Sequence, residues 1–308
     1  MFKAMVTLSV LWIILFSILM VGIGVEFLLK NHPRIIAILW IVLSMSFAGA
    51  LLSYSPYYSY IYASSYILEV SLSLDNILIF LLIFKEFGIE LANQEKAIFI
   101  GTYSAVFLRL AFVSIGIAIL EELKYGSMIL SLVVLITAGM MIKRELKEKK
   151  SEGNRLLNFV RSSLRINVAN EQKSIFIKVK GKIVPTKLLL VIIAIELADI
   201  LFATDSIPAI VLLSKIEIIA FSSTIFGTIL IRSIYLNINK SLINLPHIDA
   251  FLAIGLSFLG IASSINSIYG ISGGRIGLRI HEEIIALFVI IIIIAGILLS
   301  SVKGKLTK

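Results

Sequence analysis

The chain has 308 residues, of which 59% are hydrophobic and 15% are charged, and its mean hydropathy is +1.03. Because soluble domains are about 45–50% apolar and about 25% charged, this composition excludes a soluble globular domain. It predicts an all-α, polytopic membrane protein. In such a protein the net charge of +9 belongs to cytoplasmic loops, and no nucleic-acid partner is expected.

Metal sites built on sulfur or imidazole are not expected. The chain has no Cys, which excludes disulfide bonds, thiolate ligands and cysteine nucleophiles. The three histidines, His32, His247 and His281, lie outside the apolar runs, which argues against a zinc or copper site inside the membrane.

Apolar runs of about 20 residues, long enough to cross a bilayer, predict nine transmembrane helices. They cover residues 5–29, 34–53, 61–84, 97–120, 125–142, 187–213, 217–238, 249–270 and 283–302. The first run is too long for the apolar region of a signal peptide, and no small-residue cleavage site follows it. We therefore expect it to be retained as a helix.

Basic residues are distributed unevenly between the two ends of these predicted helices. The loops at the end that holds the N-terminus carry five Lys and Arg residues, whereas those at the other end carry 21. Since cytoplasmic loops hold the excess of basic residues, we expect the N-terminus outside and the C-terminus in the cytoplasm. The expected location is a bacterial plasma (inner) membrane.

The only long polar segment is the basic connector, residues 143–187, which the orientation places in the cytoplasm. Its start is predicted to be helical. Near its end, "SIFIKVKGKIVP" alternates apolar residues with Lys and has Gly181 where a tight turn would lie, which predicts a short β-hairpin. A solvated loop attracted to anionic lipid headgroups is the simplest interpretation, and a docking element for a protein partner is the alternative.

Two stretches of the chain share a pattern of charged residues. The first has Glu69 and Asp75 six positions apart and an Arg in the next run, and the second has Asp199 and Asp205 at the same spacing, again followed by an Arg. The arginines are Arg109 and Arg232. Each stretch contains three predicted helices, so the second must enter the membrane from the opposite side.

This pattern predicts two inverted three-helix repeats, with a binding site at their interface near the middle of the membrane. The expected domains are two N-terminal helices (1–60), the first repeat (61–142), the connector (143–187), the second repeat (188–270), and the ninth helix with a basic tail (271–308).

Five carboxylates lie well inside the predicted helices of the two repeats, and only two arginines do. The five are Glu69, Asp75, Glu196, Asp199 and Asp205. One Asp at the centre of a membrane helix costs about 2.5–3.5 kcal/mol, so these side chains should face the protein interior or water. Neutralising the two arginines would occupy only part of the set. The excess indicates protonation, bound cations or both.

Helical periodicity groups these residues on faces. One face holds Glu69, Ser73 and Asn76, and another holds Glu196, Asp199 and Ser206. A step of six residues turns a helix by about 600°, about 120° short of two full turns, so Asp205 would join Asp199 only at a local break. Pro208 could supply the break, because its ring removes the hydrogen bond to the Thr204 carbonyl. The first repeat has no such proline.

The candidate ligands are carboxylates, amides, hydroxyls and main-chain carbonyls. A set made only of oxygens suits Mg²⁺, Ca²⁺ or Mn²⁺ better than Zn²⁺ or Cu²⁺. Composition alone does not choose among these three cations, and it leaves protons and sodium open.

At these residues the chain resembles the TerC family of integral membrane proteins. The matching motifs are "EVSLSLDN" at 69–76 and "DILFATDSIPAI" at 199–210, together with "FLRLAF" and "LIRSIY" around the two arginines. The resemblance covers roughly residues 34–303. It implies inverted three-helix repeats, export of a divalent metal, chiefly manganese, and a link to tellurite resistance.

Carried over by position, the resemblance implies a metal path and a set of supporting residues. The path comprises Glu69, Asp75, Asn76, Asp199, Asp205 and Ser206; the supporting residues are Glu196, Ser73, Thr204, Pro208, Arg109 and Arg232. Two positions depart from the family pattern. Val70 stands where the family has Lys, and the family's acidic residue near the end of the first helix has no clear counterpart, although Glu26 lies close.

Three functions compete on these grounds. The first is a non-enzymatic transporter that exports Mn²⁺ or another hard divalent cation as its substrate and has no permanently bound cofactor. The second is a non-transporting scaffold that recruits partners through the connector. The third, an intramembrane aspartyl protease, is disfavoured because the chain lacks a G-x-G-D element.

Overall fold

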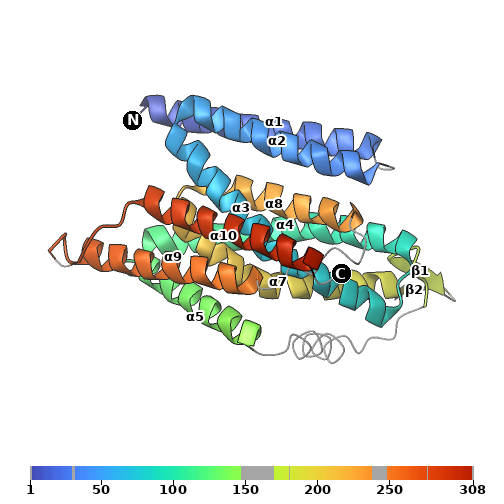
Figure 1. The fold of residues 1–308 in the computed structure, drawn as a ribbon. Coiled ribbons are helices and arrows are strands. Elements are labelled where there is room, and N and C mark those ends of the chain that lie inside the picture. The colour runs from blue at the N-terminus through green and yellow to red at the C-terminus, as the bar shows by residue number, and fades with distance from the viewer. Residues whose placement is uncertain are drawn as a thin grey trace.

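The computed structural model describes residues 2–29, 32–146, 170–179, 181–237, 248–275 and 277–306. Within these ranges the chain forms nine helices and one two-stranded sheet (Figure 1). The elements are α1 (Phe2–Leu28), α2 (Pro33–Tyr54), α3 (Pro56–Phe87), α4 (Leu91–Glu122), α5 (Gly126–Leu146), β1 (Phe176–Val179), β2 (Lys182–Pro185), α7 (Lys187–Ser214), α8 (Glu217–Asn237), α9 (Ile248–Ile271) and α10 (Glu282–Leu306).

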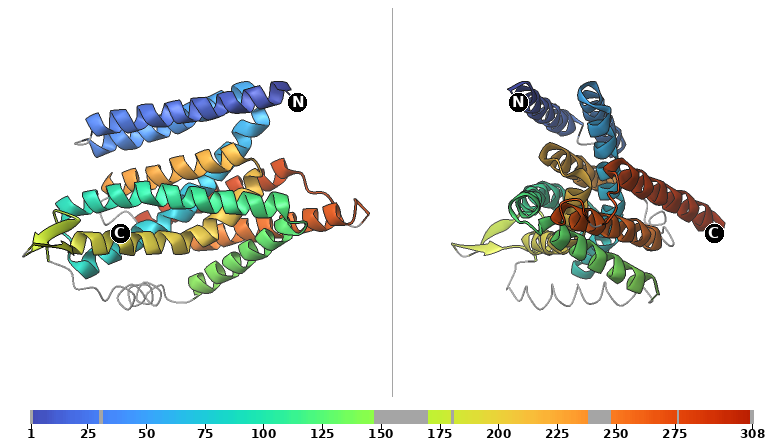
Figure 2. Two further views of the ribbon diagram at one scale, coloured as in Figure 1. Left: turned by 180° about the vertical axis from the view of Figure 1, so that it is seen from behind. Right: turned by 90° about the vertical axis from the view of Figure 1, so that its left-hand side faces the viewer.

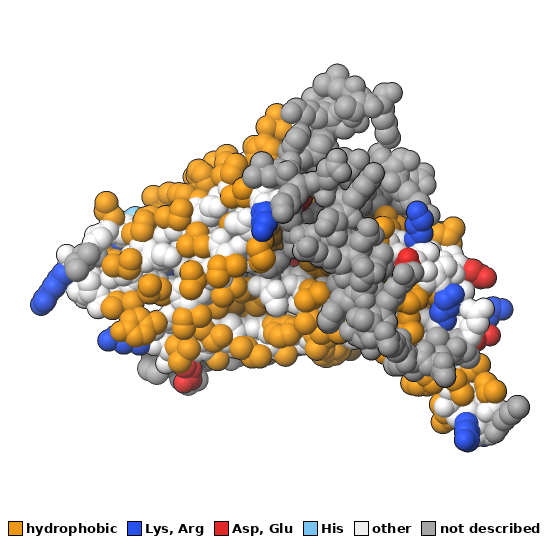
Figure 3. Space-filling model, turned by 90° about the horizontal axis from the view of Figure 1, so that it is seen from below, with side chains coloured by type: hydrophobic (Ala, Val, Ile, Leu, Met, Phe, Trp, Pro, Cys, Tyr) orange, Lys and Arg blue, Asp and Glu red, His pale blue; other side chains and the backbone are white. Residues whose placement is uncertain are grey.

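Seven helices of the described chain are long and apolar enough to cross a membrane. They are α1 to α5, α8 and α9. The other two predicted spans, 187–213 and 283–302, coincide with helices α7 and α10, which are not among the seven. The prediction of a helical membrane protein is therefore confirmed, and the count of nine spans is confirmed for seven. Figure 3 shows one face covered by hydrophobic side chains, with most of its visible charged residues toward the two ends.

Four helices form the centre of the molecule. Helix α3 packs against α8 and α7, and α4 packs against α7 and α8. Helix α5 lies against α9, and α10 covers α9 and α3. Helices α1 and α2 form a pair along one side, where α2 contacts α3 and α8 (Figure 2). First and second helices of the two predicted repeats are thus brought into mutual contact.

The predicted break near Pro208 is wrong. Helix α7 runs without interruption from Lys187 to Ser214 with Pro208 inside it, and α3 is equally continuous through residues 69–76. A proline removes one backbone hydrogen bond, but the bonds on either side hold the helix, and membrane helices tolerate such a loss when they are packed in protein. Thr204, beside the expected break, donates its hydroxyl to the Leu201 carbonyl 2.7 Å away.

The β-hairpin at the end of the connector is confirmed. Strands β1 and β2 are antiparallel, with Phe176 opposite Pro185, and Gly181 adopts the left-handed φ of 82° that the turn requires. The hairpin is tied to neighbouring helices, because Thr186 donates to the Ser174 carbonyl and Lys96 donates to the Lys173 carbonyl. The predicted basic helix of the connector falls largely on residues 147–169, outside the described residues.

At the opposite end of the bundle, a charged cluster joins three helices. Glu282, at the start of α10, accepts hydrogen bonds from Lys215 at 2.8 Å and from the Tyr57 hydroxyl at 2.5 Å. Burial alone would raise the pKa of Glu282, but the hydrogen bonds from Lys215 and Tyr57 outweigh it, so its pKa lies below the ordinary value of 4.5. The carboxylate form is therefore the one that the fold stabilises.

We expect Glu282→Gln to lower the stability at neutral pH by about 0.5–1 kcal/mol, the range of partly exposed ion pairs. A carboxyl whose pKa is depressed on folding contributes stability above its unfolded pKa and loses it as the pH falls through the folded pKa. The difference in thermal unfolding midpoint between wild type and variant should therefore begin to shrink as the pH falls through about 4.3, the ordinary pKa of Glu, and disappear below the depressed pKa of the folded state. A difference that stays constant from pH 7 to pH 3.5 would contradict this role.

Candidate functional site

One arginine organises the centre of the four-helix core. Arg109 of α4 is 1% exposed, and its guanidinium donates to both carboxylate oxygens of Asp199 on α7, at 2.9 Å from Nε and 2.7 Å from Nη2. Its third nitrogen, Nη1, donates to Oε1 of Glu69 on α3. The first acids of the two predicted repeats therefore meet on one cation.

Glu69 is held from two further sides. The Ser73 hydroxyl donates to its Oε1 at 2.9 Å. From α8, Gly227 leaves the room that the side chain needs, because a Cβ at that position would lie 2.5 Å from the Glu69 Cγ. Glu69 is fully buried, and none of the described residues donates a hydrogen bond to its Oε2.

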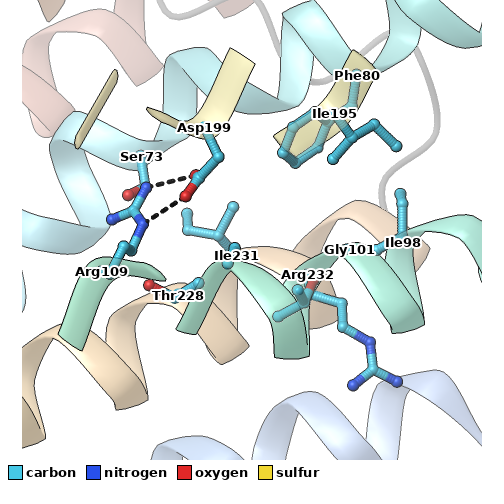
Figure 4. Close-up of a pocket in the computed structure, with 12 residues that line it drawn as sticks. Ser73, Phe80, Ile98, Gly101, Arg109, Ile195, Asp199, Thr228, Ile231 and Arg232 are labelled. Carbon is cyan, nitrogen blue, oxygen red and sulfur yellow. Dashed lines mark hydrogen bonds and ion pairs between the residues drawn. The ribbon is translucent and has the colours of Figure 1, made fainter. Parts of the chain in front are cut away.

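A small cavity adjoins this arginine and is lined by all four core helices (Figure 4). Its polar lining comprises Ser73, Thr102, Arg109, Asp199 and Thr228, and the remaining walls are mainly apolar. The cavity has room for one or two water-sized groups. A bare cation or a water molecule fits there, whereas an organic substrate does not.

Glu196 lies one helical turn from Asp199 on α7. The Ser104 hydroxyl of α4 donates to its Oε1 at 2.6 Å, and its Oε2 is buried without a hydrogen-bond donor among the described residues. Gly101 lines the cavity next to it, and an added Cβ there would lie 3.5 Å from the Glu196 Oε1. Glu196, a half-buried residue whose Oε2 atom is buried, thus places a third carboxylate beside the Arg109 cluster.

The second arginine has a different partner from the one the pattern suggests. Arg232 of α8 pairs with Glu26 of α1, with 2.5 Å between Nη2 and Oε1. Its guanidinium also lies over the ring of Phe99, 4.5 Å from the centroid. The other Glu26 oxygen accepts hydrogen bonds from Trp40 at 2.7 Å and from Tyr103 at 3.2 Å.

Glu26 is the site residue that the sequence prediction left out of the candidate set. It is 3% exposed and lies within the first predicted span. The signal was available, because Glu26 is the only carboxylate in residues 1–53 and a carboxylate in a membrane helix needs a partner.

The predicted site residues fall into three groups. Ser73, Arg109 and Asp199 line the cavity, Glu69 joins them through Arg109 and Ser73, and Glu196 is adjacent; the guanidinium of Arg232 points away from the cavity (Figure 4). Ser206 is buried, and no described residue hydrogen-bonds its hydroxyl; Thr204 is exposed. The side chains of Asp75, Asn76 and Asp205 lie outside the described residues. Among the side chains that are described, no three acids are close enough to share a metal ion.

We expect Gly227→Ala to destabilise the protein by about 1–3 kcal/mol, because the new methyl group would overlap the buried Glu69 side chain. Gly139→Ala in α5 is the matched control, since its Cβ would meet nothing within 4 Å. Thermal unfolding in detergent compares the two. Equal midpoints for both variants would show that the contact between α3 and α8 at Glu69 is not tight.

Comparison with known proteins gives one family. A model described as "Integral membrane protein TerC family" matches residues 54–307, and no solved structure matches the chain. An uncharacterised membrane protein of Buchnera aphidicola is 34% identical over 59% of this chain and 57% of its own length. The chloroplastic thylakoid membrane protein TERC of Arabidopsis thaliana is 30% identical over 64% of this chain and 52% of its own length.

A third relative, a putative membrane-bound redox modulator of Salmonella typhi named Alx, is 26% identical over 76% of both chains. The chain thus spans little more than half the length of the first two relatives and about three quarters of the third. Since the family model matches well over half of the chain, the protein belongs to the TerC family of integral membrane proteins.

Proposed function

We propose that the protein exports a hard divalent cation, Mn²⁺ in the first place, across a bacterial plasma membrane. The observation that carries this proposal is the excess of buried negative charge at Arg109. Glu69 and Asp199 share one guanidinium, so the ionised cluster has a net charge of −1 before Glu196 is counted. A buried net charge is costly unless a proton or a metal ion compensates it.

Buried oxygens that accept no hydrogen bond support a metal cation as the group that compensates the negative charge. Within the described residues, buried oxygens without a hydrogen-bond donor include Glu69 Oε2, Glu196 Oε2 and Ser206 Oγ. Thr228, whose hydroxyl also lacks a partner there, lines the cavity. Carboxylate and hydroxyl oxygens are ligands that Mn²⁺, Mg²⁺ and Ca²⁺ accept. The proposed path takes its further ligands from Asp75, Asn76 and Asp205.

The packing of the helices supports the proposed inverted repeats. The first helix of each repeat contacts the second helix of the other, as α3 does with α8 and α4 with α7. The third helices, α5 and α9, contact each other. Such reciprocal contacts are what a pseudo-two-fold axis between the units would produce, and they would place the site at the repeat interface.

A redox function, which the name of the Salmonella relative suggests, would need other chemistry in this chain. A thiol-based reaction requires Cys, and these 308 residues contain none. The scaffold hypothesis places the function in the connector and gives no role to the buried acids. It remains the alternative that the experiment must separate from transport.

Inverted membrane vesicles loaded with a metal-sensitive dye test the proposal. Wild-type vesicles should take up Mn²⁺. Asp199→Asn and Glu69→Gln should reduce the uptake rate about tenfold or more, because every 1.4 kcal/mol of lost ion binding is a factor of ten. Asp75→Asn and Asp205→Asn should have a similar effect. Parallel assays with Mg²⁺, Ca²⁺ and Zn²⁺ give the selectivity.

Glu121→Gln at the exposed end of α4 is the control and should transport like the wild type. Full transport by both Asp199→Asn and Glu69→Gln would contradict the proposed site. Complementation of a strain that lacks the gene separates the scaffold from transport. Failure of the connector deletion, together with full complementation by every acid variant, would favour the scaffold.

A further inference from the structure

We propose that Glu26 is a positioning residue: it holds the Arg232 guanidinium outside the cavity, so that a divalent cation can approach Asp199. This inference rests on the proposed function and assigns a task to α1 and α2. Both helices lie almost entirely before residue 54, where the match to the family model begins.

The two repeat arginines are placed alike in sequence but turn in opposite directions. Arg109 follows the acids of the first repeat and points inward, where Asp199 and Glu69 bind it. Arg232 follows the acids of the second repeat, and its side chain begins at the cavity wall. Its guanidinium nevertheless points away from the cavity, toward α1 and α2 (Figure 4).

Glu26 is itself fixed in place, which makes it an effective anchor. Trp40 of α2 and Tyr103 of α4 both donate to its Oε2, and its Oε1 faces Arg232. Phe99 and Tyr103 present ring faces to the guanidinium at 4.5 and 5.4 Å. The ion pair itself is buried, with Glu26 3% and Arg232 5% exposed, whereas Tyr103 is half-buried and Phe99 is exposed.

Removing the charge of Glu26 would leave a buried guanidinium without a counter-ion. Because an arginine guanidinium is always charged in proteins, the guanidinium must then find another carboxylate or water. The cavity that its stem already lines contains Asp199, and Glu196 borders it. A second guanidinium at those acids would cancel their negative charge and repel an incoming cation.

The test measures uptake as a function of Mn²⁺ concentration in the vesicle assay. Glu26→Gln breaks a buried charge pair and frees the Arg232 guanidinium to compete with Mn²⁺ for the acids at the cavity. The KM for Mn²⁺ should therefore rise roughly tenfold or more, while the maximal rate changes less. In Glu26→Gln with Arg232→Gln, the guanidinium that would enter the cavity is gone, and the KM should return toward the wild-type value. Glu121→Gln again serves as the control.

A purely structural role predicts a different pattern, in which the double variant is no better than Glu26→Gln and both lose maximal rate rather than affinity. That pattern, or an unchanged KM in Glu26→Gln, would overturn the inference. If Glu26→Gln does not assemble, Glu26→Asp keeps the charge but withdraws it from Arg232. It should raise the KM less, and Arg232→Gln should abolish that increase as well.

Failure of the proposed function would be distinguishable. Wild-type vesicles would then take up none of the four metals, and the inference would fall with it. Uptake by the wild type together with an unaltered Glu26→Gln variant would reject only the role of Glu26.

Discussion

A guanidinium buried among apolar helices constrains how the helices around it can pack. Arg109 must satisfy its donors inside the protein, and its planar guanidinium donates best to carboxylates that lie in its plane. Asp199 meets this demand through two hydrogen bonds and Glu69 through a third nitrogen. Three helices, α3, α4 and α7, are therefore held in register by one side chain, and α8 fits the cluster with Gly227.

The second arginine shows how the same constraint can be met in another way. Arg232 is compensated by one carboxylate, that of Glu26, and by two aromatic faces, and Glu26 in turn accepts hydrogen bonds from Trp40 of α2 and Tyr103 of α4. That cluster is neutral, whereas the Arg109 cluster carries an excess acid. The two arginines thus differ in their electrostatic surroundings, and among the side chains that the structure describes the excess acid lies at Arg109. Under the proposed function, this asymmetry would distinguish a structural ion pair at Arg232 from a cation site at Arg109.

Much of the architecture could be predicted from the sequence, because hydrophobic runs and buried charges leave strong signals. Seven of the nine predicted spans, the hairpin around Gly181 and the burial of Glu69 and Asp199 in the protein interior followed from them. Which acid meets which arginine could not be predicted, since periodicity gives the face of a helix but not its rotation against neighbours. The ion pair between Arg232 and Glu26 was therefore not predicted. The predicted break at Pro208 was wrong because packed neighbouring helices let α7 remain helical despite the lost hydrogen bond.

The close contact between Gly227 and Glu69 gives the bundle a mechanical property. Gly227 lies at the midpoint of α8, and Glu69 lies near the midpoint of the 32-residue α3, a rod about 48 Å long at 1.5 Å per residue. Because α3 is uninterrupted, a tilt about this contact acts as a lever. Such a tilt would move the two ends of α3 in opposite directions, so that spreading at one end of the bundle would accompany tightening at the other. The contact that packs the charged centre is thus also placed where a pivot would have to be.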